Sequence, residues 1–421
     1  MPSFRQYERL FEVRILIVSQ YYWPEDFRIN DLAIGLDEKG HQVTILTGKP
    51  NYPGGSFFQG YGFFNKTNET CNGIAIKRVP IIPRGRGGAF RLLMNYLSFV
   101  VSALLLGPFL CRGKYDVIFV YEPSPVTVGI PARFLGWLKK IPVIFWVQDL
   151  WPESLVATGT TSNKYIISAV GKMVKWIYSG CALILTQSRT FVESIKEFGI
   201  SETRIQYYPN SAEKLYEPVT YDQATCKRLG LPEGFIVMFA GNIGVSQDFE
   251  TILAAAAITR EMTDLHWVIV GDGREFSRVE KEVKKMGLEN TFHLMGRHPV
   301  ESMPIFFSCA DVMLVSLKNE PIFAMTIPSK IQSYMACGKP ILAALAGEGA
   351  HIVEEAEAGI ASGAEDPAAL ADGVMQLYNM QEEERNQMGQ NGLDYYRHHF
   401  DRDMLYERLD SWMHNLVKAD N

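Results

Sequence analysis

The chain has 421 residues, of which 47% are hydrophobic and 21% are charged, and its formal net charge is −6. This composition excludes a disordered or low-complexity protein, and the length exceeds one ordinary core, so we expect two domains of about 200 residues each. Residues 1–210 contain 23 basic and 15 acidic side chains, whereas residues 211–421 contain 18 and 32. The two halves are therefore predicted to face different surroundings.

The six cysteines are scattered, with no C-x-x-C pair and no histidine cluster beside them. This spacing is typical of reduced thiols in a cytoplasm, and it argues against a zinc site or a disulfide framework. Residues 1–13 carry four charged side chains and have no apolar core of signal-peptide length. We interpret them as a short extension before the first strand.

Apolar runs of strand length recur through the first half of the chain, with helical stretches between them. Because these runs are apolar throughout and do not alternate, they indicate strands covered by helices on both faces of a parallel, doubly wound sheet. The expected strands are residues 14–19, 42–47, 115–121, 142–147, 182–187 and 204–208.

The same pattern restarts after Pro209-Asn210-Ser211, which predicts a second wound sheet and a hinge near residues 209–220. Two such sheets in tandem create a cleft between their carboxyl edges, where ligands usually bind in this architecture. The expected strands are residues 235–240, 267–270, 291–295, 311–317 and 340–345. The predicted domains are residues 14–212 and 213–392, followed by helices over 393–421 that return to the first domain.

Glycine-containing turns follow three strands of the second set: Gly241–Gly244, Gly271–Gly273 and Gly296-Arg297. Glycine lets main-chain amides approach an anion closely. None of these turns has the dinucleotide fingerprint G-x-G-x-x-G, and each alone has an ordinary structural explanation. Their shared position at one sheet edge predicts an anion-binding site.

The segment T-I-P-S-K-I-Q-S-Y-M-A-C-G-K-P-I, residues 326–341, has the pattern of a phosphate cradle at the start of a helix. Pro328 suits a first helical turn, whose amides have no partner within the helix. Those amides and the helix dipole attract anions, and Ser329 and Lys330 add a hydroxyl and a positive charge. Gly338 is the expected C-terminal cap. We predict a diphosphate as ligand, and the alternative is a plain helix opening with a solvated lysine.

Together these residues resemble the retaining family 4 glycosyltransferases of the GT-B fold. The strings N-Y-P-G-G at 51–55, Q-D-L-W-P-E-S at 148–154 and P-S-K-I-Q-S-Y-M at 328–335 are similar to a bacterial subgroup that builds capsule, O-antigen or colanic-acid repeat units. Within it, the chain resembles transferases of N-acetylfucosamine type. The resemblance implies two Rossmann-like α/β domains facing a central cleft, a UDP-sugar donor and a polyprenyl-diphosphate-linked sugar acceptor.

The chain departs from the family pattern at the donor site. Many members have a pair of glutamates where this chain has Met325 and Ser333, and an Arg and a Lys in the turn that here holds Asn242 and Gln247. The diphosphate charge is therefore expected to be met largely by Lys330 and by the amides of Gly244, Ser329 and Lys330, with Arg274 or Arg297 as a further contributor. Met325 suggests a deoxy or N-acetylated donor sugar. The expected donor-binding residues are Asn242, Gly244, Gln247, Gly271, Arg274, Arg297, Met325, Ser329, Lys330, Gln332 and Ser333.

Asp149 and Glu153 follow the expected strand at 142–147 and are the carboxylates predicted for the cleft wall of the first domain. A carboxylate there could orient the acceptor hydroxyl or offset charge on the sugar, and with Lys330 the two form the predicted catalytic set. The alternative is that Asp149 caps a helix and Glu153 is a solvated acid in its first turn. Amides, a lysine and a helix dipole can stabilise a leaving phosphate, so no metal or other cofactor is expected. The resemblance implies retention of configuration.

Residues 92–111 form an apolar run among basic residues. About 20 apolar residues can span a bilayer, but polar residues interrupt this run and a sheet strand follows at once. We expect a helix that lies on the anionic inner face of the plasma membrane, and the alternative is a helix packed into the core. The residues expected on this acceptor and membrane side are Tyr22, Arg28, Asn51, Tyr52, Arg84, Arg86 and Arg91.

The expected function is transfer of a sugar from a UDP-sugar to a lipid-linked saccharide by a cytoplasmic, peripheral membrane enzyme, with no nucleic-acid partner. Three alternatives remain open. A nucleotide-sugar epimerase of the same fold would need a carboxylate and histidine cluster, and an exported solute-binding receptor would need a signal peptide. The third alternative is an inactive, transferase-like scaffold, which the missing glutamates would fit.

Overall fold

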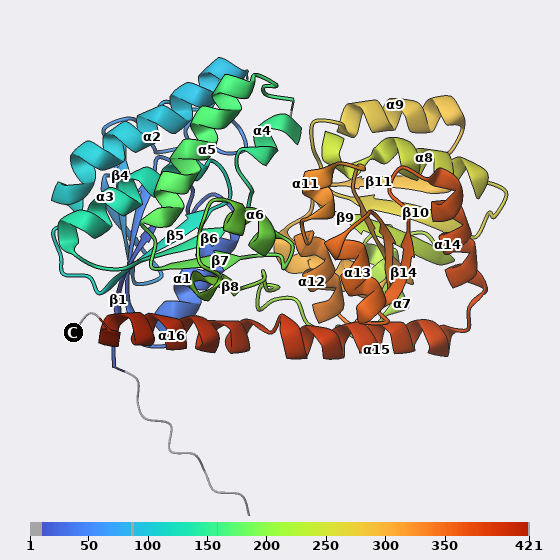
Figure 1. Ribbon diagram of the computed structural model, residues 1–421. Coiled ribbons are helices and arrows are strands. Elements are labelled where there is room, and N and C mark those ends of the chain that lie inside the picture. Colours follow the sequence, from blue (N-terminus) through green and yellow to red (C-terminus); the bar gives the residue numbers. More distant parts are fainter. Residues whose placement is uncertain (1–10, 86–87, 158, 420–421) are drawn as a thin grey trace, which may run out of the picture. The chain divides into compact units, whose positions relative to one another are not determined.

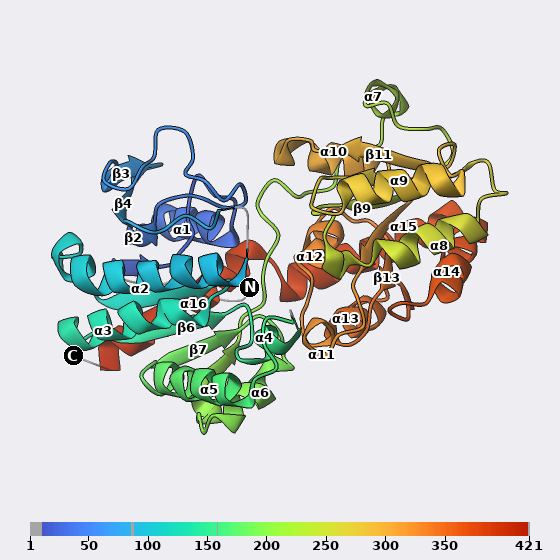
Figure 2. The same ribbon diagram turned by 90° about the horizontal axis from the view of Figure 1, so that it is seen from above.

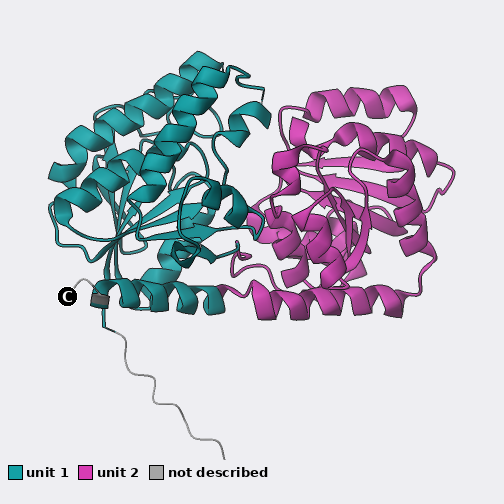
Figure 3. Cartoon of the chain, viewed as in Figure 1, with its two compact units in different colours: residues 1–209, 403–421 teal, residues 210–402 magenta. Residues whose placement is uncertain are grey.

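The computed structural model describes residues 11–85, 88–157 and 159–419 (Figure 1). The chain divides into two compact units, residues 1–209 with 403–421 (unit 1) and residues 210–402 (unit 2), coloured separately in Figure 3. Each unit is a β-sheet with helices on both faces, as the two views in Figures 1 and 2 show. The described residues thus contain the two wound sheets that the sequence predicts.

Unit 1 has an eight-stranded sheet of order β3-β4-β2-β1-β5-β6-β7-β8. All neighbours pair in parallel except β3 and β4, which form an antiparallel hairpin at the edge. The hairpin was not expected, whereas the other six strands lie within two residues of the predicted ranges. The strands are β1 (Arg14–Val18), β2 (Gln42–Gly48), β3 (Asn68–Cys71), β4 (Ile74–Val79), β5 (Val117–Glu122), β6 (Val143–Val147), β7 (Leu183–Thr186) and β8 (Ile205–Tyr207).

Helices cover both faces of this sheet. In Figure 1, α2, α3 and α5 lie on one face, and α1 and α16 lie on the other. Asn163 caps α5 by accepting a hydrogen bond from the Tyr165 amide, as expected for an N-cap asparagine. The helices of unit 1 are α1 (Arg28–Glu38), α2 (Ala89–Leu110), α3 (Gly129–Lys139), α4 (Glu153–Ala157), α5 (Lys164–Ser179), α6 (Phe191–Glu197) and α16 (Arg402–Ala419).

Unit 2 has a six-stranded parallel sheet of order β11-β10-β9-β12-β13-β14. Five strands match the predicted runs, and β14, a short strand at the edge, was not predicted. The strands are β9 (Phe235–Ala240), β10 (Leu265–Val270), β11 (Phe292–Gly296), β12 (Val312–Ser316), β13 (Ile341–Ala344) and β14 (Gly359–Ser362).

The apolar core of unit 2 joins one face of this sheet to α8, α9 and α14. The opposite face carries α12, which packs against β12, β13 and α15. The helices are α7 (Gln223–Arg228), α8 (Phe249–Ile258), α9 (Phe276–Met286), α10 (Met303–Ser308), α11 (Pro321–Ala324), α12 (Ser329–Ala336), α13 (Glu348–Glu355), α14 (Pro367–Asn379) and α15 (Glu382–His399).

The last helix, α16, belongs to unit 1 although it ends the chain. The ring of Tyr406 lies over Gly35 of α1, where any Cβ would come within 1.9 Å of it, and its hydroxyl donates to Asp31 at 2.7 Å. The expected boundary between residues 392 and 393 falls inside α15, and the division lies at 402/403. The helical pattern continues through residue 392, so it could not mark the change of unit.

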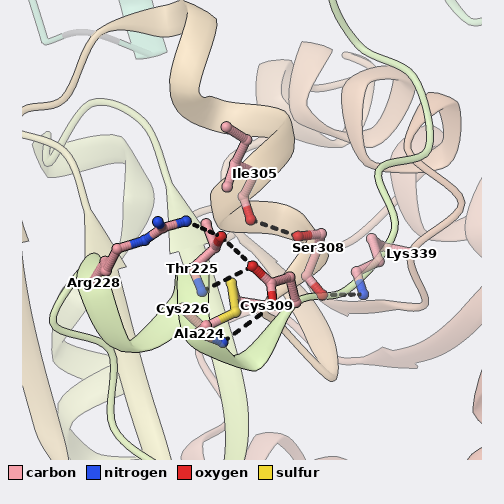
Figure 4. Close-up of a disulfide and its surroundings, with 9 residues drawn as sticks. Ala224, Thr225, Cys226, Arg228, Ile305, Ser308, Cys309 and Lys339 are labelled. Atoms are coloured by element: carbon pink, nitrogen blue, oxygen red, sulfur yellow. Dashed lines mark hydrogen bonds between the residues drawn. A yellow bond between two sulfur atoms is a disulfide. The ribbon is translucent and has the colours of Figure 1, made fainter.

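The expectation that all cysteines are reduced is wrong for one pair. Cys226 of α7 and Cys309, which follows α10, form a disulfide with a Cα–Cα distance of 5.8 Å (Figure 4). The two residues are 83 positions apart in the sequence, so spacing motifs could not reveal the pair. The other four cysteines, Cys71, Cys111, Cys181 and Cys337, are free thiols.

Candidate active site

The glycine turns of unit 2 lie at the carboxyl edge of its sheet and bond to one another. The Gly241 amide donates to Val270 O at 2.9 Å, and the Gly271 amide donates to Gly296 O at 2.8 Å. Gly271 has a φ of +150°, and a Cβ there would come within 1.9 Å of Gly241 O. Only glycine permits this approach of two main chains, so the turns form one continuous surface after β9, β10 and β11.

The helix α12 begins at Ser329, directly after Pro328, as the sequence predicts. Its Tyr334 hydroxyl both donates to Ala240 O and accepts from Ala240 N, at 3.2 and 3.1 Å. These bonds fix α12 to the end of β9. Gly338, with a φ of +66°, ends the helix as predicted, because its amide and that of Lys339 bond back to the last turn.

Lys330 runs from the first turn of α12 along the Gly241 turn, where a Cβ on Gly241 would lie 2.8 Å from Lys330 Cε. Its Nζ donates to Gln247 Oε1 and lies 3.7 Å from the centroid of the Phe239 ring. Burial lowers the pKa of Lys330 to about 7. Neither Gln247 nor Phe239 carries a negative charge that would offset this effect. An anion at this turn would supply the missing counter-charge.

The other expected donor residues occupy three kinds of position. Those with exposed side chains are Asn242, Arg274, Arg297 and Ser329, and those that are partly buried are Gly244, Gln247, Gly271 and Met325. Gln332 and Ser333 are buried, and both bond to the opening turn of α12: Ser333 Oγ donates to Ser329 O at 3.2 Å, and the Gln332 amide nitrogen faces Pro328 O at 3.1 Å. These two side chains therefore support the helix opening from within the protein.

In unit 1, the predicted carboxylate Asp149 follows β6. Its Oδ1 accepts a hydrogen bond from Ser154 Oγ, and its main-chain amide donates to Glu122 Oε2 at 3.4 Å. Burial raises the pKa of Asp149 to about 6 and also raises the pKa of Glu153, the first residue of α4. A carboxyl group with a pKa near neutrality suits proton transfer.

Sequence reasoning missed Glu122, the last residue of β5. Its side chain is 0% exposed, and burial together with the nearby Asp149 carboxylate raises its pKa well above the usual value. Strands β5 and β6 are parallel neighbours, so Glu122 and Asp149 emerge at the same sheet edge. The indication that the sequence offered is that Glu122, a carboxylate, directly ends the apolar run of β5.

The expected acceptor residues Asn51, Tyr52 and Arg84 come together beside β1 and β2. The Arg84 amide donates to Asn51 Oδ1 at 3.0 Å, and its guanidinium lies 5.1 Å from the Tyr52 ring centroid. Buried Glu25 accepts both the Asn51 and Tyr52 amides, at 2.8 and 2.7 Å. Tyr21 and Phe27 pack against the Tyr52 ring, which is 38% exposed and lies beside the Arg84 cation.

The other residues expected on the acceptor and membrane side are Tyr22, Arg28, Arg86 and Arg91. Tyr22 lies in the apolar core of unit 1 and is 3% exposed. Arg28 opens α1 and is partly buried. Arg91 Nε donates to Pro83 O at 3.4 Å, and Arg86 lies outside the described residues.

The apolar run expected at 92–111 forms α2, the one helix in the described ranges that is long and apolar enough to cross a membrane. Only 28% of its apolar window is buried, and a core helix of a soluble protein can pass the same test of length and composition. One face, which includes Asn95, Phe99 and Ala103, is buried in unit 1. Phe90, Leu105 and Phe109 on the remaining surface are 76%, 64% and 63% exposed.

The part of the chain that the structure describes holds no group of three or more His, Cys, Asp or Glu side chains that could bind a metal ion. The chemical groups at the two sheet edges are a lysine, helix amides and turn amides in unit 2, and carboxyl groups in unit 1.

Two families of glycosyltransferase domain match the chain. The glycosyl transferase 4-like domain family matches residues 27–211, and the glycosyl transferases group 1 family matches residues 225–394. The first match covers most of the sheet of unit 1, and the second covers the whole sheet of unit 2.

Known proteins agree with these matches. The chain is 24% identical over 338 residues to the putative colanic acid biosynthesis glycosyl transferase WcaI of Escherichia coli, covering 77% of this chain and 82% of that protein. It is 27% identical over 297 residues to the probable glycosyltransferase WbjE of Pseudomonas aeruginosa, covering 68% and 72%. The fold resembles that of HepE from Anabaena in complex with UDP, with a TM-score of 0.71 and 13% identity over 96% of this chain and 100% of that one. The chain therefore belongs to the glycosyltransferases of the GT-B fold, with a 4-like domain followed by a group 1 domain.

Proposed function

We propose that the enzyme transfers an N-acetylated or deoxy amino sugar from a UDP-sugar to a polyprenyl-diphosphate-linked saccharide, with retention of configuration, in the synthesis of a bacterial surface polysaccharide. The observation that carries the proposal is the placement of Lys330 and the opening of α12 beside the Gly241 turn. The names of WcaI and WbjE support a bacterial glycosyltransferase, and the UDP bound to HepE supports the choice of nucleotide.

In this proposal the diphosphate binds at the opening of α12. The bond between the anomeric carbon and the diphosphate oxygen breaks, and the acceptor hydroxyl forms a new bond to that carbon on the same face. Lys330 and the amides of the first turn stabilise the charge that develops on the departing phosphate, without reorganising. The proton of the acceptor hydroxyl passes to the phosphate oxygen. Asp149 orients the hydroxyl, and no metal ion is needed for any of these steps.

The donor sugar is proposed from Met325, which is partly buried next to the cradle where many related enzymes place a glutamate. A thioether cannot bind a sugar hydroxyl as a carboxylate does, so it favours a sugar with a less polar edge. Release of UDP from a panel of UDP-sugars tests this. We expect UDP-N-acetylated or deoxy sugars to be used in preference to UDP-glucose, and a clear preference for plain glucose would contradict the assignment.

The acceptor is proposed to lie at the inner face of the plasma membrane, where the exposed apolar side of α2 would rest. Arg91 and Arg112 lie at the two ends of this helix, and anionic lipid attracts such cations. The wild type is expected to sediment with phosphatidylglycerol vesicles at low salt. A triple variant, Phe90→Ser with Leu105→Ser and Phe109→Ser, should lose this binding. Wild-type protein that ignores the vesicles would contradict the proposal.

The second candidate is an inactive scaffold of a polysaccharide-assembly complex, which the absence of the glutamate pair at Met325 and Ser333 favours. A measurement of UDP release with polyprenyl-diphosphate N-acetylglucosamine as acceptor separates the two functions. Turnover that Lys330→Ala abolishes supports the transferase. Binding of UDP without any turnover, over the whole donor panel, supports the scaffold.

A further inference from the structure

The carboxyl group of Glu122 is buried in unit 1 without full hydrogen bonding. Its Oε1 atom has no hydrogen-bond partner within the described ranges, and its side chain is 0% exposed. Burial of an unsatisfied polar group is unfavourable, so such groups are rare and call for an explanation. Glu122 lies at the carboxyl edge of its sheet, where this architecture binds its ligands.

The second oxygen of Glu122 faces the segment that carries Asp149. Its Oε2 accepts the Asp149 amide at 3.4 Å, while Ser154 Oγ donates to the Asp149 side chain. Asp149 is thus held at its main chain by Glu122 and at its carboxylate by Ser154. Burial, together with the neighbouring Asp149 carboxylate, raises the pKa of Glu122 well above its usual value.

The backbone that follows Glu122 is strained. Ser124 has a φ of +122°, which residues with a Cβ rarely adopt, and Tyr96 of α2 bonds to its side chain. The titratable groups that face Glu122 and its neighbour come from three further elements: Tyr96 from α2, Glu153 from α4 and Tyr178 from α5. None of these three groups is a cation, so none of them supplies a counter-charge for a Glu122 carboxylate.

We propose that Glu122 is a positioning residue: by accepting the Asp149 amide, it holds the Asp149 segment in the orientation needed to bind the acceptor hydroxyl. It does not touch the substrate, and it acts through Asp149. The inference rests on the proposed role of Asp149 in acceptor orientation.

Variants of Glu122 test this inference in the full-length enzyme, with polyprenyl-diphosphate N-acetylglucosamine as acceptor and the best donor from the UDP-sugar panel. Glu122→Gln keeps a side-chain oxygen that can accept the Asp149 amide, so we expect kcat within about threefold of wild type. Glu122→Leu removes the oxygen that accepts the Asp149 amide hydrogen bond. We therefore expect kcat to fall about tenfold or more while KM for the UDP-sugar changes little.

Asp116→Asn is the matched control, because Asp116 lies beside the opposite end of β5 and bonds Arg14 there. It should lower the melting temperature without changing kcat. If Glu122→Leu fails to fold, Glu122→Gln still decides, because a loss as large as that of Asp149→Asn would show that the proton or charge of Glu122 is itself needed. Wild-type kcat in folded Glu122→Leu would equally overturn the positioning role.

A double-mutant cycle separates this inference from the proposed function. If Glu122 acts through Asp149, then Glu122→Leu should cause little further loss in an Asp149→Asn background. Losses that multiply in the double variant would overturn the inference while leaving a role for Asp149 intact. Wild-type kcat in Asp149→Asn alone would instead overturn the proposed role of Asp149.

Discussion

Lys330 is the residue whose protonation should report nucleotide binding. In the free protein its amine is surrounded by Phe239 and Gln247, and burial holds its pKa at about 7. A diphosphate beside it would raise that pKa, so binding at pH 8 should take up close to one proton. The affinity for UDP should accordingly weaken as the pH rises above about 7. Calorimetric titrations of UDP in HEPES and in Tris at pH 8 measure the proton uptake.

A neutral replacement provides the comparison. Lys330→Met keeps the aliphatic length, and we expect it to abolish the proton uptake and to weaken UDP binding about 10- to 100-fold, the range for loss of a charged hydrogen bond. Lys281→Met removes an exposed lysine of α9 and should bind like wild type. Equal proton uptake in wild type and Lys330→Met would show that the diphosphate does not meet this amine.

The sequence could predict single residues where a local rule decides their place. Lys330 and Gly241 were both predicted at the same edge, because helix openings and glycine turns meet there in a wound sheet, and the structure places them in contact. Glu122 could not be assigned, since its importance depends on contacts with Asp149 across two strands. Gln332 and Ser333 share the first turns of α12 with Lys330, but only the packing of α12 shows that they point inward.

At the scale of elements, the disulfide between α7 and the end of α10 should contribute to the stability of unit 2. It closes a loop of 83 residues, for which chain entropy predicts about 4 to 5 kcal/mol in the free energy of unfolding. Cys226→Ser with Cys309→Ser should therefore lower the stability of protein purified without reductant. Denaturant unfolding of both proteins, with and without dithiothreitol, measures the difference.

The same experiment bears on the compartment. In a reducing cytoplasm the pair would stay open, so the double variant and the reduced wild type should unfold alike. Alkylation followed by mass measurement of protein taken directly from cells counts the free thiols. Six reactive cysteines would agree with the proposed location, whereas four would indicate that the disulfide forms in the cell. An oxidised wild type no more stable than the variant would contradict the structural role of the bond.

Elements with a strong apolar run were predictable, and the polar edge strand β3 was missed although the Asn72-Gly73 turn, with both residues at positive φ, is typical of a tight hairpin. Strand β3 is polar and half exposed, and it pairs with β4 at the edge of the sheet. Buried Arg78 of β4 donates to the carbonyls of Gly48 and Trp23 and bonds Glu69 of β3, so side-chain contacts hold the hairpin. An arginine in a strand gives no periodic indication of such a role.

At the scale of the whole molecule, repetition of the strand pattern was enough to predict two wound sheets in tandem. The restart after Pro209 agrees with the division between the two compact units. The sequence could not show which unit the last helix, α16, belongs to, because α15 and α16 have similar patterns and are separated only near residue 400. Their assignment depends on which core receives their apolar side chains, and that is decided by tertiary packing.

Unit 1 is consequently discontinuous in the sequence. A chain truncated after Arg402 lacks α16, and its unit 1 should not fold. Helix α16 buries Leu405, Tyr406, Leu409 and Met413 in the core of unit 1, and each such side chain contributes about 1.5 to 3 kcal/mol. Their sum is comparable to the 5 to 15 kcal/mol that typically stabilises a domain, so the truncated protein should have unit 1 unfolded at 25 °C. Unit 2 remains complete and should still bind UDP.

Thermal unfolding with and without UDP tests this prediction. The wild type should show an unfolding transition for each unit. The truncated chain should show only the transition of unit 2, whose melting temperature UDP raises. Tyr406→Phe, which removes the hydrogen bond to Asp31 but keeps the ring over Gly35, is the milder control and should cost about 1 kcal/mol. A domain that loses these four buried side chains cannot keep its stability. A truncated chain that melts like the wild type would therefore show that α16 is not part of the core of unit 1.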